Sequence, residues 1–273
     1  MAVQRDVFFL SDGTGITAET LGNALLTQFE GCTFEKTTLP FIHSVERAHS
    51  VVEYLRQVEK TSGERPIVFS TTTSNAIRDE LRAAPVLFID LFDSMLPAIE
   101  AELGVKSTHA QGRAHSLADG NRYDARMAAV NYAMEHDDGQ SVRDLPRADV
   151  VLIAPSRCGK TPTSIYLALQ YGIFAANFPL TEDDLTELRL PRSIATYSGK
   201  LFGLTSAIER LHEVRSERRP GSTYSSVSQC AFELRQAEQL YRRHGIPYVN
   251  SEHMSVEEIA ATVMQERGLR RTA

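Results

Sequence analysis

One stretch of this sequence constrains the fold more than any other, because an apolar run leads into a short loop rich in small residues. The run occupies residues 149–153, the loop Ala-Pro-Ser-Arg-Cys-Gly-Lys-Thr occupies 154–161, and an apolar-periodic segment continues to Gly172. This order predicts a buried strand, a tight loop and an amphipathic helix. The loop fits the spacing GxxxxGK[ST], with Ala154 in place of the first glycine.

The residue types in this loop suit the binding of a phosphate group. Gly159 lets the backbone approach an anion, Lys160 supplies a cation, and the Thr161 hydroxyl can act as a Mg²⁺ ligand. We expect the loop to bind a nucleotide, with Lys160 and Arg157 acting in catalysis. A chance loop is the competing interpretation, and the flanking strand and helix argue against it. The expected binding residues are Ala154, Pro155, Ser156, Arg157, Cys158, Gly159, Lys160 and Thr161.

The cysteines allow few structural uses. Cys158 lies in the loop, where a helix N-terminus and nearby cations would lower the pKa of a thiol; a small, unreactive loop residue is the simpler interpretation, which we favour. With Cys32 and Cys230 the count is odd and no CxxC pair occurs, which excludes a complete disulfide framework and a cysteine-based zinc site.

Apolar runs alternate with helical patterns along the rest of the chain. The runs at residues 7–10, 66–69, 86–90 and 149–154 are nearly continuous, as in parallel strands covered on both faces. The sequence therefore predicts an α/β fold with mostly parallel sheets and flanking helices. The helical stripes expected to face the core are Ala18, Leu21, Leu25 and Phe29; Val45, Ala48, Val52 and Leu55; Tyr123, Met127, Val130 and Met134; and Val227, Cys230, Leu234, Ala237 and Tyr241.

A stretch near the middle of the chain has the composition of a linker. Residues 139–147 carry glycine, proline and charge but little apolar content. We therefore expect an N-terminal α/β domain over residues 1–145 and a C-terminal, kinase-like P-loop domain over 146–273. Ser255 and Glu258 form a capping box that predicts the start of the last helix.

Two aspartates come directly after predicted strands of the N-terminal half. The first apolar run leads into Ser-Asp-Gly-Thr-Gly at residues 11–15, and open α/β sheets bind ligands at the carboxyl ends of their strands. Asp12 is therefore expected to be catalytic, through metal binding or proton transfer, although Thr17 in this loop can simply cap the next helix. Asp90 ends another strand and resembles an aspartate that holds a Mg²⁺-bound water, but it lies upstream of the phosphate loop, so this interpretation stays open.

Histidine and arginine gather in the segment His-Ala-Gln-Gly-Arg-Ala-His at residues 109–115. His109 and His115 lack a matching set of ligands nearby, which argues against a zinc site. We expect His115 to act in proton transfer and Arg113 to contact phosphate; a solvated loop is an equally good interpretation.

Charged clusters in the second half have bland and functional interpretations. Asp-Asp-Gly at residues 137–139 comes after a predicted helix, and we favour a helix-ending turn. Arg126 borders the stripe of that helix and can project into a pocket. Arg215, Arg218 and Arg219 are placed on a polar loop, where they form a solvated face or close over a bound nucleotide.

Charge and hydropathy exclude other classes of protein. The net charge of −6 argues against a general polyanion binder. The N-terminus lacks the long apolar segment of a secretory signal. The uncharged stretch between Lys160 and Glu182 contains two prolines and a glycine, so it is a poor membrane-spanning helix. We expect a cytoplasmic protein.

Several segments together resemble one family, the bacterial and plastid regulatory proteins of phosphoenolpyruvate synthase and pyruvate phosphate dikinase. The resemblance covers residues 7–265, and the form Ser-Arg-Cys-Gly-Lys-Thr-Pro is similar to the synthase branch. The sequence departs from the family at Ala154, where the family usually has glycine. The matching stretches are FLSDGTGITAETLGNALL, GRAHS, RMAAVNYAMEHDDG, ADVVLIAPSRCGKTPTSIYLALQYGIFAANFPL, LFGLT and VEEIAATVM.

This resemblance implies a bifunctional serine/threonine kinase. Such a protein transfers phosphate from ADP to a threonine of phosphoenolpyruvate synthase, which inactivates that enzyme, and reverses the modification with inorganic phosphate, which releases pyrophosphate. The implied partners are the synthase and a nucleotide, with Mg²⁺ and without nucleic acid or membrane; a homodimer is a reasonable guess. The residues alone leave open a dikinase target, an ordinary P-loop small-molecule kinase or ATPase, and a nucleotide-sensing module without catalysis.

Overall fold

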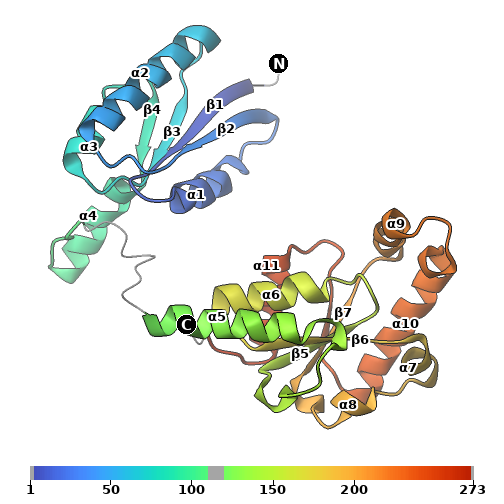
Figure 1. Ribbon diagram of the computed structural model, residues 1–273. Coiled ribbons are helices and arrows are strands. Elements are labelled where there is room, and N and C mark those ends of the chain that lie inside the picture. Colours follow the sequence, from blue (N-terminus) through green and yellow to red (C-terminus); the bar gives the residue numbers. More distant parts are fainter. Residues whose placement is uncertain (1–2, 110–119, 272–273) are drawn as a thin grey trace. The chain divides into compact units, whose positions relative to one another are not determined.

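The computed structural model describes residues 3–109 and 120–271. Its chain divides into two compact units, Met1–Ser116 and Leu117–Ala273. The elements of both units are labelled in Figure 1.

Unit 1 is a parallel sheet with helices on both faces (Figure 1). Its four strands lie in the order β2-β1-β3-β4, and all three pairings are parallel. In chain order its elements are β1 (Val3–Leu10), α1 (Ile16–Leu26), β2 (Cys32–Leu39), α2 (Val45–Ser62), β3 (Ile67–Ser70), α3 (Asn75–Leu81), β4 (Leu87–Asp90) and α4 (Leu91–Leu103).

The two faces of β1 enter two different hydrophobic clusters, because successive side chains of a strand point to opposite faces. Phe8 and Leu10 pack with buried residues of α2 and α3. Val7 and Phe9 pack with residues of α1 and with Leu91 at the start of α4. A strand buried on both faces gives the nearly continuous apolar run seen in the sequence.

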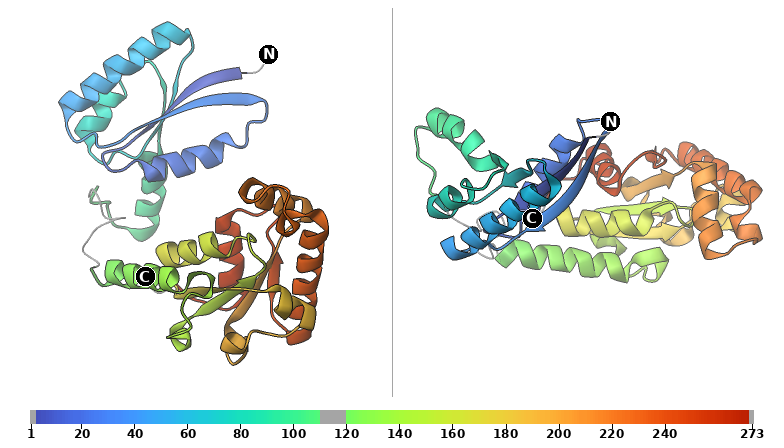
Figure 2. Two further views of the ribbon diagram at one scale, coloured as in Figure 1. Left: turned by 45° about the vertical axis from the view of Figure 1, so that its right-hand side comes forward. Right: turned by 90° about the horizontal axis from the view of Figure 1, so that it is seen from above.

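Unit 2 repeats this plan with more helices. Its parallel sheet has the order β6-β5-β7-β8, and Figure 2 shows helices on both of its faces. Its elements are α5 (Gly120–Glu135), η2 (Asp137–Gly139), η3 (Leu145–Arg147), β5 (Val150–Ala154), α6 (Lys160–Tyr171), β6 (Ala175–Pro179), α7 (Glu182–Glu187), α8 (Arg192–Ala195), η4 (Ser198–Lys200), β7 (Leu201–Thr205), α9 (Ile208–Arg218), η5 (Thr223–Ser225), α10 (Val227–His244), β8 (Tyr248–Asn250) and α11 (Val256–Glu266).

Strand β5 is the centre of unit 2, and all five of its residues are buried. Val150, Leu152 and Ala154 face a cluster built with α6, α9 and α11. Val151 and Ile153 face a second cluster built with α7, α8 and α10. The loop after β5 therefore starts from a rigid, fully packed strand.

The expected fold class is confirmed, and all four predicted strands are present. The capping box of Ser255 and Glu258 opens α11, and Gly172 ends α6 in the left-handed conformation. The strands that were not predicted are β2, β6, β7 and β8. Charged or polar residues interrupt β2 at the sheet edge, and Asn177 and Pro179 interrupt the apolar run of β6.

Several residues expected to face the core are exposed instead. Val45 and Val227 are the first residues of their helices and Phe29 comes after the end of α1, so spacing alone does not place them on the buried side. In α1 the buried residues are Ala18, Gly22 and Leu26, and in α5 they include Ala129 and Tyr132. The exposed residues are Leu25, Phe29, Val45, Tyr123, Met134 and Val227.

The boundary between the units lies before α5 rather than near residue 145. Helix α5 packs against α6 through the small side chains of Ala129, Ala133 and Ala168. Tyr132 and Leu145 are buried in the second cluster of unit 2. The polar composition of residues 139–147 thus belongs to a surface connection inside unit 2, and the domain ranges 1–145 and 146–273 require this correction.

None of the helices in the described ranges has the length and apolar character needed to cross a lipid bilayer.

Candidate functional site

The loop between β5 and α6 lies between a buried strand and a helix, as the sequence predicts. The strand ends at Ala154, and Gly159 precedes α6 in the left-handed region, with φ of 88°. Ala154 does not have a positive φ. The backbone at this position therefore does not require glycine. Alanine at this position therefore adopts its backbone conformation without strain.

The backbone of this loop offers hydrogen-bond donors without protein partners. No N–H group of residues 156–161 donates to an acceptor within residues 3–109 and 120–271. Several such groups in succession, leading into the positive end of a helix, form a site for an anion. The predicted phosphate loop thus has the required donors.

Lys160 places a cation at this site, and only 4% of its side chain is exposed. Its Nζ donates to the Pro155 carbonyl oxygen at 3.3 Å and lies 3.5 Å from an Asp138 carboxylate oxygen. Burial lowers the pKa of Lys160, and the charge of Asp138 opposes this shift. A phosphate group beside the ammonium would favour its charged form.

The acidic turn after α5 faces the phosphate loop. Asp137 Oδ1 accepts from the Thr161 hydroxyl at 2.7 Å and from Asn177 Nδ2 at 2.6 Å. Asp138 has a positive φ of 46°, and its backbone N–H donates to Asn177 Oδ1 at 2.8 Å. A merely helix-ending turn was the favoured interpretation, and the contacts with Thr161 and Lys160 show that it was incomplete.

Asn177 is a site residue that the sequence did not identify. It lies on β6, is buried, and also contacts Ser164 on α6 at 3.3 Å. The sequence drew attention to Asp137 and Asp138 because they form an adjacent pair of carboxylates. Nothing in the sequence marked Asn177, which lies in an apolar run. Pairing of β6 with β5 brings Asn177 to the loop.

A cavity of about 270 Å³ opens beside the loop. Its lining combines loop residues, the acidic turn and helix α9. The lining residues are Asp138, Ser156, Arg157, Gly159, Lys160, Thr161, Pro162, Val214 and Arg218. This volume and this mixture of charges suit the phosphates of a nucleotide next to a divalent cation.

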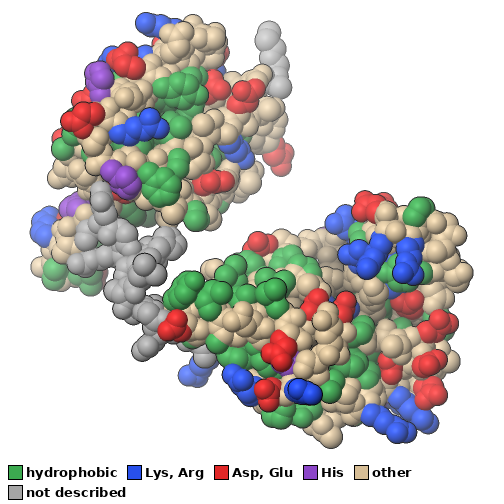
Figure 3. All heavy atoms as spheres, viewed as in Figure 1, with side chains coloured by type: hydrophobic (Ala, Val, Ile, Leu, Met, Phe, Trp, Pro, Cys, Tyr) green, Lys and Arg blue, Asp and Glu red, His purple; other side chains and the backbone are tan. Residues whose placement is uncertain are grey.

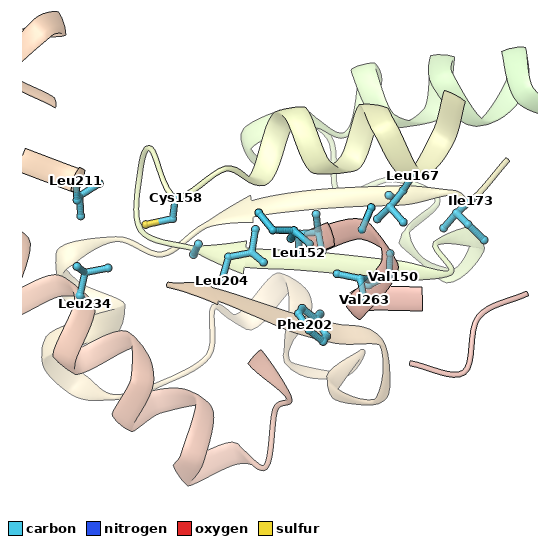
Figure 4. Close-up of a cluster of buried hydrophobic side chains, with 14 of the residues drawn as sticks. Val150, Leu152, Cys158, Leu167, Ile173, Phe202, Leu204, Leu211, Leu234 and Val263 are labelled. Carbon is cyan, nitrogen blue, oxygen red and sulfur yellow. The ribbon is translucent and has the colours of Figure 1, made fainter. Parts of the chain in front are cut away.

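Cys158 is a packing residue of the loop. Its side chain is buried in the cluster beneath the loop, as Figure 4 shows. Burial raises the pKa of its thiol to about 12, although Lys160 and Arg215 act in the opposite direction. Burial therefore disfavours the thiolate, and the position of Cys158 in the core agrees with the simpler interpretation. Its neighbour Arg157 is exposed, with φ of 73°.

The three arginines predicted on a polar loop have different environments. Arg215 and Arg218 belong to α9, and only Arg219 comes after it. Arg215 is fully buried, whereas Arg218 is exposed and lines the cavity. Lys and Arg side chains gather over the α9 end of unit 2 in Figure 3. The prediction of a solvated face is therefore wrong for Arg215, which is buried.

The residues around Thr161 fit a magnesium ion that takes some of its ligands from the protein and the others from a bound substrate. The described residues contain no group of three His, Cys, Asp or Glu side chains able to hold a metal by themselves. The Thr161 hydroxyl and the Asp137 carboxylate already lie together. Mg²⁺ commonly takes one or two such oxygens and completes its shell with phosphate and water.

In unit 1, Asp12 joins the ends of two neighbouring strands. Its Oδ2 accepts from the Thr73 backbone N–H at 2.7 Å and from the Thr73 hydroxyl at 2.6 Å. Asp90 caps α4 and pairs with the buried Arg78 at 2.9 Å, which accounts for it without a metal. His115 and Arg113 lie outside the described residues.

Comparison with known proteins bears on the family of this chain. The model of the kinase/pyrophosphorylase family matches residues 7–264. Proteins named "Putative phosphoenolpyruvate synthase regulatory protein" are similar over 98% of this chain: one from Hahella chejuensis is 49% identical over 99% of its own length, and one from Alkalilimnicola ehrlichii is 50% identical over 97%. A third, from Pseudomonas fluorescens, is 48% identical over 99% of its length. The chain belongs to the kinase/pyrophosphorylase family.

Proposed function

We propose that this protein regulates phosphoenolpyruvate synthase by reversible phosphorylation. In one direction it transfers phosphate from ADP to a threonine of the synthase; in the other it removes that phosphate with inorganic phosphate and releases pyrophosphate. The family and the names of the relatives support this proposal. The observation that carries it is the cavity where free backbone donors, Lys160 and the acidic turn meet.

ADP is the proposed donor, held by its phosphates at residues 154–161. The loop N–H groups and Lys160 bind the β-phosphate, while Arg157 and Arg218 are the exposed cations at the cavity. Thr161 and Asp137 would hold Mg²⁺, which supplies charge neutralisation at the phosphates. Asn177 fixes the Asp137 carboxylate for this purpose.

In the forward step the threonine oxygen of the synthase attacks the β-phosphorus of ADP. The bond from that phosphorus to the α–β bridging oxygen breaks, and AMP leaves with the electron pair. Lys160 and the loop N–H groups stabilise the charge that develops on the transferred group. Asp138 contributes a carboxylate to the cavity lining and is therefore the candidate to accept the hydroxyl proton. Catalytic roles for Asp12 and His115 stay predictions.

In the reverse step an oxygen of inorganic phosphate attacks the phosphorus of phosphothreonine. The bond to the threonine oxygen breaks, that oxygen takes up a proton, and pyrophosphate leaves. Two phosphate groups meet in this step, so it requires several cations. Lys160, Arg157 and Arg218 supply them within unit 2, and Arg215 is too deeply buried to contact a phosphate directly.

A labelling experiment tests both directions. The protein is incubated with phosphoenolpyruvate synthase and β-labelled ADP, and label is sought on threonine; phosphate is then added and labelled pyrophosphate is measured. Lys160→Ala and Asp137→Asn should lower the labelling rate at least a hundredfold. Lys60→Ala, an exposed lysine of α2, is the control that should keep full activity.

Four outcomes would contradict the proposal. Label from γ-labelled ATP but not from ADP indicates an ordinary kinase, and label on pyruvate phosphate dikinase alone indicates the other target. Binding of ADP without transfer indicates a nucleotide sensor. Full activity of the Lys160 variant would remove the loop from the site.

A further inference from the structure

Arg215 is a fully buried charged side chain beneath the phosphate loop, and the proposed chemistry does not use it directly. Its Nε and Nη2 donate to the Ser156 carbonyl oxygen at 3.3 and 3.0 Å. Nη1 donates to the Tyr224 carbonyl oxygen at 3.0 Å, and Nη2 also pairs with Glu233 at 2.6 Å. One guanidinium thus joins the loop, the segment before α10 and α10 itself.

The contact with Ser156 determines how the next peptide group is oriented. A trans peptide is planar, and its C=O and N–H bonds point in opposite directions. When Arg215 holds the Ser156 carbonyl oxygen with two bonds, the N–H of Arg157 must point away from Arg215. That N–H is one of the loop donors without a protein acceptor within the described ranges.

Tyr224 strengthens this arrangement from a second direction. Its hydroxyl lies 2.9 Å from Ser156 Oγ, and its ring lies 4.3 Å from the Arg215 guanidinium carbon. Arg157 comes next with φ of 73°. This left-handed conformation is unfavourable for any residue that carries a side chain. Neighbouring contacts must therefore hold the loop in this shape, and those of Arg215 and Tyr224 meet it at Ser156.

We infer that Arg215 is a positioning residue for the phosphate loop: it orients the Ser156–Arg157 peptide so that the Arg157 N–H faces the bound β-phosphate. Glu233 and Tyr224 hold Arg215 in this position. The inference rests on the proposed nucleotide site, and it assigns to the buried ion pair a function in binding beyond its contribution to stability.

The test compares Arg215→Lys and Tyr224→Phe with matched controls. Lysine keeps a charge for Glu233 but cannot make the two-bond contact, and phenylalanine removes only the hydroxyl. The controls are Arg242→Lys and Tyr248→Phe, because Arg242 pairs with Glu238 and Tyr248 in the same unit without touching the loop. ADP affinity is measured by calorimetry well below the Tm of each variant, where each is folded.

A positioning function predicts about tenfold weaker ADP binding for Arg215→Lys, about threefold for Tyr224→Phe, and no change for the controls. A second readout uses no ligand. It is the amide resonance of Gly159 in ¹⁵N-glycine-labelled protein, which Gly159→Ala assigns. This resonance should shift in Arg215→Lys and Tyr224→Phe and stay unchanged in the two controls.

The outcomes separate this inference from the proposed function. Lower Tm with unchanged ADP affinity and an unchanged Gly159 resonance would show that Arg215 is structural only, which overturns the inference. If Lys160→Ala binds ADP as well as the unmodified protein does, the nucleotide site itself is wrong. If unmodified protein binds no ADP, the Gly159 resonance still decides whether Arg215 orients the loop.

Discussion

The two units of this protein have the same sheet topology. They differ in the loop after the first strand of each sheet, which is β1 in unit 1 and β5 in unit 2. Their strand orders, β2-β1-β3-β4 and β6-β5-β7-β8, correspond position by position. In each sheet the chain moves from one side of that strand to the other, and such a switch point is where open α/β sheets bind ligands. Gly15 and Gly159 begin the helices there, with φ of 84° and 88° and no side-chain cap.

The chemistry at the two switch points is different. In unit 1 the loop at residues 11–15 contains Asp12 and no cation. Ser11 Oγ accepts from the Gly13 N–H at 3.0 Å, and Asp12 binds Thr73 across the strand ends. In unit 2 the loop contains Arg157 and Lys160, and the N–H groups of residues 156–161 have no acceptor within the described chain. The comparison teaches that the two loops differ in charge: Arg157 and Lys160 favour an anion in unit 2, whereas the Asp12 carboxylate opposes one in unit 1.

Among these tests, neutralising Lys160 in the unit 2 loop and Asp12 in the unit 1 loop should produce the largest difference in ADP affinity. Lys160→Met should weaken ADP binding about a hundredfold, because a hydrogen bond to a charged group contributes roughly 1.5–3 kcal/mol. Asp12→Asn should leave ADP affinity within about twofold. Calorimetric titration of both variants measures this difference. An equal loss in the two variants would mean that both switch points contact the nucleotide.

Adding a methyl group to each helix-starting glycine should have an intermediate effect. Both alanine variants place a side chain in the left-handed region, which costs roughly 1–2 kcal/mol. At Gly15 the new Cβ would also lie 2.8 Å from Thr38 Cγ2, whereas at Gly159 it meets no protein atom within 4 Å.

We therefore expect Gly15→Ala to be the less stable variant in urea unfolding, with unchanged ADP affinity. Gly159→Ala should bind ADP about tenfold more weakly, since its methyl group enters the space of the phosphate. Unchanged affinity in Gly159→Ala would place the phosphate elsewhere.

Modifying the cysteines should have the smallest effect on ADP binding. Burial raises the pKa of Cys158 to about 12 and also raises that of Cys230, so both thiols should react more slowly than an ordinary exposed thiol. Cys32 of unit 1 is partly exposed. Iodoacetamide should label Cys32 alone in the native protein, leaving ADP affinity unchanged, as peptide mass spectrometry and titration would show.

Labelling in guanidinium chloride, which should modify all three cysteines, is the control for accessibility. Rapid native labelling of Cys158 would show that the phosphate loop opens, contrary to its packing in the cluster of Figure 4.

The phosphate loop was predictable because its information is local. The apolar run, Gly159 and Lys160 occupy neighbouring positions, and each favours the observed backbone on its own. The acidic turn was visible in the sequence but not its partner, since Asp137 reaches Thr161 across 24 positions. Asn177 gave no signal, because its importance becomes visible only with the pairing of β5 and β6.

Arg215 shows the limit of inferring exposure from charge. A run of arginines and polar residues is typical of a solvated loop, and for Arg218 that interpretation describes the exposed side chain correctly. Helix α9 extends through Arg218, which turns Arg215 inward toward Glu233 and Ser156. A buried charge requires partners, and no local pattern indicates which distant carbonyl groups will supply them.

The sequence by itself determined the α/β class, the strand–loop–helix unit around residues 154–161 and the family, because apolar runs, glycine positions and motif spacing act over a few neighbouring residues. The tertiary structure decided where unit 1 ends, which side of each helix is buried, and how Asp137, Asn177 and Arg215 meet the loop. The physical reason is that hydrogen bonds and ion pairs across a parallel sheet join residues tens of positions apart, and strand order fixes which of them become neighbours.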